Sequence, residues 1–259
     1  MAVTTVSDFE AFKSAVETNG ASDILLSADI TFSSGVKIPL TTKSLTIDGG
    51  GHTITDMNST AYTSALYVQG NAGDTTVTVK NANFSGRNYY GMVPVTDGTN
   101  NAGVTVIISG VSYKGPQAIY NRYGTTIIEN SDISIEKNGS SATPQEFIEG
   151  NRLVLRGKVN ITSVSSGSAL VWFPYAGAAF TVEAGAAVSI SAPNTYGFYT
   201  DTAAKPAFLF GVGSSTDITV KTGLFYSAGS GAHIAASITL EKKRRAQRRC
   251  DGERRRAYR

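Results

Sequence analysis

Short segments of the form apolar-x-apolar, each ended by a polar residue, recur along this chain. Seven copies occur, and glycine or asparagine follows the polar residue in five of them. The copies lie at 45–49, 77–81, 106–110, 127–130, 153–157, 180–184 and 218–222. Their polar residues are separated by 32, 29, 20, 27, 27 and 38 positions, about 29 on average. A repeat of this length indicates stacked supersecondary units.

The repeat also predicts the fold class. A unit of about 29 residues has room for three short strands and three turns, and it buries its inward face only by stacking on neighbouring units. Glycine or asparagine after the polar residue suits a turn that requires positive φ. We therefore predict an all-β protein, a right-handed single-stranded parallel β-helix (solenoid) with an N-terminal capping α-helix.

Further strands are expected around these copies. Segments 24–26, 30–32 and 36–38 should form a first coil. Secondary strands are expected at 65–68, 91–93, 118–120, 147–148, 170–173, 197–199 and 208–210. Aromatic side chains should fill the interior, namely Phe84, Tyr113, Phe180, Phe208 and Phe225.

The N-terminal segment predicts an amphipathic helix over residues 7–18. Ser7 and Glu10 form a capping box, and Phe9, Phe12 and Val16 share one helical face. Asn19 and Gly20 should end the helix. We expect residues 1–22 to cap the open first coil of a β-helix domain over 23–240.

The charge distribution separates a tail from this domain. The chain carries a net charge of +3, but residues 241–259 alone hold ten Lys or Arg and three acids. The body is therefore acidic, with 13 basic and 17 acidic residues. The tail shows no repeat, so we expect it to be disordered or artefactual. Its one aromatic residue, Tyr258, does not make the series of interleaved aromatic side chains that reads a nucleic acid, and we expect no nucleic-acid partner.

Compartment signals are sparse. The only cysteine, Cys250, lies in the tail, so the body has no disulfide. No apolar stretch approaches the ~18 residues of a membrane-spanning helix, and we expect no membrane insertion. The start shows neither the basic nor the apolar region of a signal peptide.

Several segments of the body, across residues 20–200, carry a resemblance to a known family. They are 45–54, 81–86 with 90–91, 113–117 with 120–121, and 145–149 followed by 157–163. Through them the chain resembles the pectate lyase-like adhesive domain of Gram-positive surface proteins. The resemblance implies an extracellular or cell wall-associated module of a longer protein. Its implied partner is a polysaccharide or a host or surface glycoprotein.

Enzymatic chemistry is the alternative, because parallel β-helices include polysaccharide lyases and glycosidases. A hydrolase needs paired carboxylates, and the chain has no Asp-Asp pair. Neither His52 nor His233 has an acidic or basic neighbour in sequence, and His52 suits a solvated turn. A lyase needs calcium held by carboxylates and a basic residue. Such a cluster would draw its members from Arg87, Arg122, Arg152, Arg156, Glu129, Asp132, Glu146 and Glu149.

The plainer interpretation of these charges is a solvated outer face. We therefore lean away from an enzyme and assign no catalytic or metal-binding residue. We expect no cofactor, although a lyase site would require calcium. Convergence of Glu129, Glu146 and Glu149 beside Arg122 or Arg152 would favour the enzyme. A third alternative, a phage receptor-binding fibre, would be favoured by trimerisation.

The segment Gln145–Glu149 and a set of aromatic residues indicate where a ligand would bind. Strand alternation turns one glutamate of this segment against the apolar face, and a buried carboxylate needs a partner, such as Arg122, Arg152 or a turn. Sugars stack on aromatic rings, and we expect Tyr123, Tyr175 and Tyr196 with the others at turns between strands. The candidate ligand-binding residues are Tyr89, Tyr90, Gln117, Tyr120, Arg122, Gln145, Glu146, Glu149 and Trp172.

Deletion of residues 241–259 tests the assignment of the tail. Because the tail offers no apolar period to bury, the melting temperature should change by no more than about one or two degrees. Thermal unfolding of the two chains measures this change. A drop of about ten degrees or more would show that the tail caps the solenoid.

Overall fold

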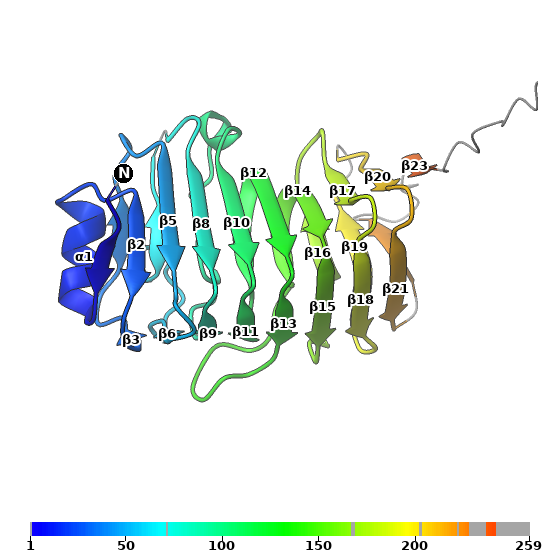
Figure 1. Cartoon of the computed structure of the whole chain (residues 1–259). Coiled ribbons are helices and arrows are strands. Elements are labelled where there is room, and N and C mark those ends of the chain that lie inside the picture. The colour runs from blue at the N-terminus through cyan, green and yellow to red at the C-terminus, as the bar shows by residue number, and fades with distance from the viewer. Residues whose placement is uncertain are drawn as a thin grey trace, which may run out of the picture.

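The computed structural model shows an all-β parallel solenoid of about seven turns, which confirms the predicted fold class. It describes residues 2–70, 72–166, 169–201, 204–221, 223–227 and 237–241. The strands stack side by side along one axis, with helix α1 (Phe9–Glu17) at one end (Figure 1). His233 and all of the tail except Glu241 lie outside the described residues.

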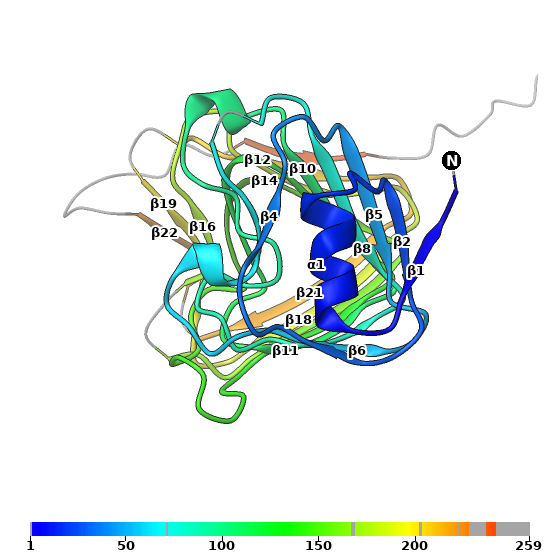
Figure 2. The ribbon, with the colours of Figure 1, turned by 90° about the vertical axis from the view of Figure 1, so that its left-hand side faces the viewer.

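Three faces surround the axis, and they are seen end-on in Figure 2. The first face holds β1 (Thr4–Val6), β2 (Asp23–Leu26), β5 (Ser44–Asp48), β8 (Thr76–Lys80), β10 (Thr105–Ser109), β17 (Ala179–Val182), β20 (Ala207–Phe210) and β23 (Ser237–Leu240). The second holds β3 (Ile30–Thr31), β6 (Thr53–Thr55), β9 (Asn83–Ser85), β11 (Ser112–Gly115), β13 (Asp132–Ile135), β15 (Lys158–Ser163), β18 (Ala187–Ala192) and β21 (Ser215–Val220). The third holds β4 (Val36–Ile38), β7 (Leu66–Val68), β16 (Ala169–Phe173), β19 (Tyr196–Thr200) and β22 (Phe225–Ser227). Short 3-10 helices occur at η1 (Tyr62–Ser64) and η2 (Thr99–Asn101).

Two long strands turn the corner between the third and first faces. They are β12 (Ile119–Glu129) and β14 (Ile148–Arg156). The two strands pair with each other. The first residues of β14 then pair with β16 on the third face, and its last residues pair with β17 on the first face. The register between β12 and β14 shifts after Asn121, so that residues 122–124 of β12 form a bulge against Asn151 alone. Bulges bend a strand and redirect its side chains, and this bulge lies at the corner.

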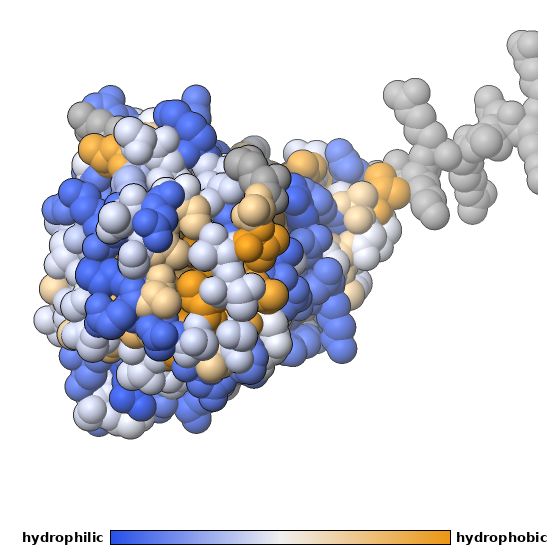
Figure 3. All heavy atoms as spheres, turned by 60° about the vertical axis from the view of Figure 1, so that its left-hand side comes forward, coloured by the Kyte–Doolittle hydropathy of each residue, from blue (hydrophilic) through white to orange (hydrophobic). Residues whose placement is uncertain are grey.

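The N-terminal helix covers the first coil, as expected. Phe9 and Phe12 are buried and lie 5.3 and 5.6 Å from the ring of Phe32, measured between centroids. Figure 2 shows α1 across the end of the solenoid, and hydrophobic residues surface there only as small patches among polar ones (Figure 3). The predicted N-cap, Ser7, is wrong. Asp8 caps the helix because its extended backbone lets Oδ1 accept the N–H of Ala11 at 2.8 Å.

The turns after β8, β10, β12 and β14 repeat one backbone conformation. Asn81, Gly110, Asn130 and Gly157 all have φ between +46° and +63°, which confirms the expected positive φ at these four positions. After β5 the positive φ falls on Gly50 and not on the expected Gly49. The asparagine side chains also join coils, since Asn130 Oδ1 accepts the N–H of Lys158 at 3.1 Å. The turns therefore stack as a ladder along one edge.

The predicted secondary strand 208–210 and the last repeat copy, 218–222, need correction. Segment 208–210 belongs to the first face, where Val182 of β17 pairs with Phe210 of β20. Segment 218–220 is part of β21, which pairs with β18 on the second face. The true copy was missed because Gly211 follows Phe210 directly, without the polar residue that marks the other copies. The predicted strand at 91–93 is also absent, since Gly91 forms only an isolated bridge to Ile119.

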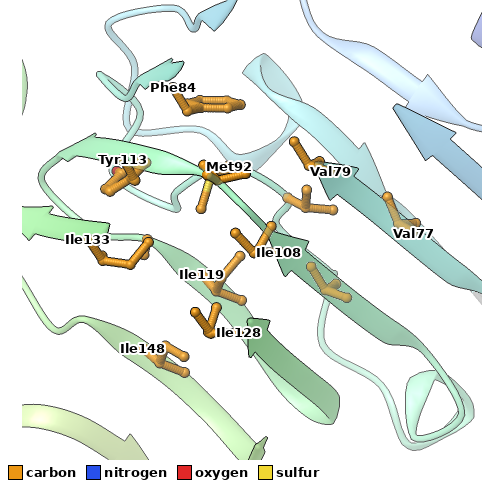
Figure 4. Close-up of a cluster of buried hydrophobic side chains, with 14 of the residues drawn as sticks. Val77, Val79, Phe84, Met92, Ile108, Tyr113, Ile119, Ile128, Ile133 and Ile148 are labelled. Atoms are coloured by element: carbon orange, nitrogen blue, oxygen red, sulfur yellow. The ribbon is translucent and has the colours of Figure 1, made fainter. Parts of the chain in front are cut away.

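Large side chains fill the interior. Phe84, Tyr113, Phe180 and Phe208 are buried as predicted, whereas Phe225 is only partly buried. Figure 4 shows Phe84 and Tyr113 in the apolar cluster with isoleucines from successive coils. Four apolar side chains are exposed near the other end of the described chain, namely Leu224, Tyr226, Ile238 and Leu240.

One carboxylate is enclosed in this fold. Asp56, after β6, is 1% exposed and accepts the backbone N–H groups of Arg87 and Asn88 in the next coil. Burial raises the pKa of Asp56 to about 7, although these two hydrogen bonds oppose the shift. Asp56 therefore links two coils through its hydrogen bonds, although burial disfavours its charged form.

Gly157→Ala tests the ladder of turns. Gly157 has φ +59°, and a Cβ there would overlap Asn130 Oδ1. The substitution should lower the free energy of unfolding by about 2 to 3 kcal/mol, combining backbone strain with loss of the Asn130 contact. Denaturant unfolding measures the loss.

Gly185→Ala is the matched control. Gly185 occupies the turn of the next coil with φ +75°, but nothing lies within 4 Å of the position that a Cβ would take. It should cost only about 1 kcal/mol. Equal losses in both variants would contradict the role of the asparagine ladder.

Candidate ligand-binding face

The third face carries a column of large polar and aromatic side chains in register. Tyr120 of β12 pairs with Glu149 of β14, Glu149 with Trp172 of β16, Trp172 with Tyr199 of β19, and Tyr199 with Tyr226 of β22. In-register parallel strands place such residues about 4.8 Å apart. The column therefore runs along the axis over five successive coils.

Arg122 lies at the centre of this face because the corner bulge includes it. Its Nη1 donates to Asp97 Oδ2 at 2.8 Å, and its Nε lies 3.0 Å from Glu149 Oε1. The Nε contact is an ion pair without hydrogen-bond geometry. The guanidinium carbon lies 5.6 Å from the ring centroid of Trp172 and 5.0 Å from that of Tyr175. One arginine thus joins two carboxylates and two aromatic rings.

Glu149 is the buried glutamate that the sequence predicted, and Arg122 is its partner. It is 7% exposed, and burial raises its pKa to about 7. Arg122 opposes the shift, while Glu146, Asp97 and Asp201 add to it. The predicted alternation fails one step earlier, because a bend at Phe147 buries both Phe147 and Ile148.

A tyrosine cluster extends the face toward the capped end. Tyr90 packs edge-on against Tyr89 and Tyr120, with centroids 5.0 and 4.9 Å away. Tyr89 Oη donates to Gln145 Oε1 at 3.5 Å, and Tyr120 Oη donates to Asp97 Oδ2 at 3.1 Å. The second contact connects the tyrosines to the carboxylate that holds Arg122.

Asp201 and Tyr199, which the sequence did not single out, complete the face together with Tyr123 and Tyr175. Trp172 Nε1 donates to Asp201 Oδ2 at 3.3 Å, and the Trp172 ring lies edge-on to Tyr199 at 5.6 Å. Tyr123, from the bulge, stacks on Tyr175 at 4.2 Å. We call the following residues the aromatic face: Tyr89, Tyr90, Asp97, Tyr120, Arg122, Tyr123, Glu149, Trp172, Tyr175, Tyr199 and Asp201.

Most of the predicted ligand-binding residues therefore lie together. Tyr89, Tyr90, Tyr120, Arg122, Gln145, Glu149 and Trp172 are connected by the contacts above, and Glu146 lies close enough to influence Glu149. Gln117 does not reach the surface. It is fully buried, and its Nε2 donates to Ile119 O at 3.4 Å.

The expected turn positions were partly wrong. Tyr120 and Tyr123 lie on β12, Trp172 on β16 and Tyr196 on β19, whereas Tyr89, Tyr90 and Tyr175 lie in turns. The signal that would have found Tyr199 and Tyr226 is the column itself, since each follows an interior phenylalanine of a third-face strand.

The other charged candidates lie elsewhere. Glu129, at the far end of β12, accepts from Ser109 Oγ at 3.0 Å and pairs in register with Arg156. Arg152 donates to Thr125 Oγ1, Ala102 O and Tyr123 O at the border of the aromatic face. Asp132 accepts from Asn160 on the second face, and the Arg87 backbone contacts Asp56. The convergence of Glu129 with Glu146 and Glu149 that would have favoured an enzyme is therefore not formed.

His52 has an acidic neighbour that its sequence position did not reveal. Its Nδ1 lies 3.5 Å from Asp29 Oδ1 of the preceding coil, on a partly exposed turn. Within the described ranges, no three His, Cys, Asp or Glu side chains gather as metal ligands. No described helix has the length and apolar character to cross a bilayer.

Comparison with known proteins gives a family match. Residues 3–120 match the family described as "Putative pectate lyase-like adhesive domain". The predicted resemblance is confirmed. The match covers the cap, the first coils and the tyrosine cluster, whereas Glu149 and Trp172 lie beyond it. The family description supports an adhesive module.

Two solved structures match the chain. That of L. reuteri 53608 SRRP is 19% identical, with a TM-score of 0.70 over 93% of this chain and 100% of that chain. That of L. reuteri 100-23 SRRP is 13% identical, with a TM-score of 0.41 over 92% of this chain and 98% of that chain. The first similarity shows a shared fold. No curated protein matches the sequence.

Glu149 predicts a pH-dependent stability. Its pKa is raised from 4.5 to about 7 on folding, so the folded state binds the proton more tightly than the unfolded state. This contribution to stability is present at low pH and is lost as pH rises through about 7; Asp56 acts in the same direction. The free energy of unfolding should therefore be higher at about pH 5 than at about pH 8, and Glu149→Gln should reduce the difference by about 2 kcal/mol.

Denaturant unfolding at the two pH values measures this difference. Glu183→Gln is the matched control, because Glu183 also pairs with an arginine, Arg156, at 2.8 Å but on an exposed surface. The control should keep the pH difference of the unchanged protein. A pH difference that Glu149→Gln leaves intact would contradict the assignment.

Proposed function

We propose that this chain is a non-catalytic adhesive module that binds glycans through the aromatic face. The observation that carries the proposal is the network around Arg122, which joins Tyr120, Trp172 and Tyr175 through direct contacts and Asp97. The match of residues 3–120 to an adhesive domain supports it.

The chemistry of the aromatic face suits sugars. Aromatic rings offer large apolar surfaces with little conformational freedom to lose, and the apolar side of a pyranose ring can stack on them. Asp97 and Asp201 place carboxylate oxygens beside the rings of Tyr120 and Trp172. These oxygens can accept hydrogen bonds from sugar hydroxyls. A polymer lying along the axis would meet similar positions in each coil.

The position of the carboxylates favours binding over catalysis. A hydrolase needs an acid and a base on either side of one glycosidic bond. Glu149 is buried against Arg122, and Glu129 lies at the opposite end of β12. Asp97 is held by the same arginine as Glu149. We therefore assign these groups to the positioning of Arg122 and its neighbouring rings.

The proposed setting is the cell surface or the extracellular space, as part of a longer protein. The partner would be a polysaccharide or a glycoprotein of a host or another surface. The family description supports adhesion, and the aromatic face supports a sugar ligand. No cofactor takes part in this proposal.

Binding of the full chain to immobilised polysaccharides and mucin-type glycoproteins tests the proposal. Trp172→Ala and Tyr175→Ala should each weaken binding at least about tenfold, since loss of a stacked ring commonly costs more than 1 kcal/mol. Tyr67→Ala is the control, because Tyr67 is a partly exposed tyrosine on β7, near α1.

The control should bind as the unchanged protein does. Cleavage of a polymer without retention would contradict the proposal. Binding to a polymer that neither Trp172→Ala nor Tyr175→Ala weakens would also contradict the proposal.

A further inference from the structure

We infer that the aromatic face selects glycans without carboxylate or sulfate groups and disfavours acidic ones. This inference rests on the proposed glycan binding and adds the class of ligand. Its basis is the negative charge of carboxylates held among the aromatic rings, which repels acidic sugars and is compatible with neutral ones.

The carboxylates of this face are built into it. Asp97 is held by Tyr120 and Arg122 at 3.1 and 2.8 Å, and Asp201 by Trp172 at 3.3 Å. Glu149 lies beneath them, paired with Arg122 at 3.0 Å. These contacts fix the carboxylates of Asp97 and Asp201 beside the rings on which a sugar would stack, so a bound acidic sugar would lie close to both charges.

Arg122, the cation at the centre of the face, already has carboxylate partners within the protein. Arg122 faces two carboxylates, Asp97 and Glu149, and its guanidinium lies against the rings of Trp172 and Tyr175. Its side chain is only 20% exposed. An anionic group of a ligand would have to replace Asp97 to reach it. Replacing one carboxylate by another gains little charge attraction.

Other cations lie at the border of the face. Arg152 contacts Tyr123 O but has its donors directed to Thr125 and Ala102 as well. Lys221 Nζ lies 5.9 Å from the ring centroid of Tyr196, toward the far end. The centre of the face therefore carries an excess of negative charge, as does the body of the chain, with its 13 basic and 17 acidic residues.

A neutral sugar avoids this repulsion and uses the same groups. Its ring can stack on Trp172 or Tyr175, and its hydroxyls can donate to Asp97 and Asp201. Carboxylates accept hydrogen bonds more strongly than neutral oxygens do. A carboxylated sugar would instead bring like charges together, which costs affinity at low salt.

Pairs of polymers that share a sugar backbone, one neutral and one carrying carboxylates, test this inference on the full chain. Suitable pairs are dextran and carboxymethyl-dextran, hydroxyethyl cellulose and carboxymethyl cellulose, and methyl-esterified and de-esterified homogalacturonan. The neutral member of at least one pair should bind at least about tenfold more tightly at low salt. The gap in affinity should shrink at about 0.15 M salt, where the Debye length is about 8 Å.

Asp201→Asn is the decisive variant, because asparagine keeps an oxygen that can accept from Trp172 Nε1. It should strengthen binding of the acidic member about three- to tenfold, because one repelling charge is removed. Binding of the neutral member should not become stronger, because its hydroxyls lose a charged acceptor. Asp217→Asn is the control, because Asp217 lies on β21 of the second face.

The outcomes separate the two proposals. Tighter binding of the acidic members, still weakened by Trp172→Ala, would overturn the charge selection and leave glycan binding in place. Equal binding of both members, with no response to Asp201→Asn, would also overturn the charge selection and leave glycan binding in place. Failure to bind any polymer of either charge would overturn both.

Discussion

Parallel in-register stacking of the coils is the constraint on which this structure depends. Each coil buries its inward side chains only against its neighbours, so residues at equivalent positions must match in direction and size. The first-face turns show how strict the match is, because Asn81, Gly110, Asn130 and Gly157 share one backbone conformation. The same constraint acts on outward side chains. It places Tyr120, Glu149, Trp172 and Tyr199 in one column although they are distant in sequence.

The corner bulge of β12 converts that column into a candidate binding face. Three residues of β12 oppose one of β14, which brings Arg122 and Tyr123 out between the column and the turn at Tyr175. Arg122 then satisfies the buried Glu149. A buried charge without a partner is costly, so the ion pair and the aromatic contacts support each other. The face is therefore a consequence of the fold and of one local departure from its regular register.

The sequence predicted the solenoid because strand alternation and turn residues repeat in most coils. It also predicted that one glutamate near Phe147 would be buried with Arg122 as one of three candidate partners. The copy at Phe210 could not be found by the same pattern, because glycine replaces its polar residue. Asp97 and Asp201 were missed because the segments that carry them vary in length from coil to coil. Gln117 was misplaced because nothing local distinguishes an inward from an outward polar residue in an irregular segment.

The fluorescence of Trp172 tests most directly the claim that the aromatic face binds the glycan. Trp172 is the only tryptophan of the chain, and it lies at the centre of the aromatic face against Arg122 and Asp201. A glycan that binds there should change the tryptophan fluorescence in a saturable way, with the same midpoint as binding measured independently. Binding of a glycan with no change in that emission would place the binding surface elsewhere and contradict the account.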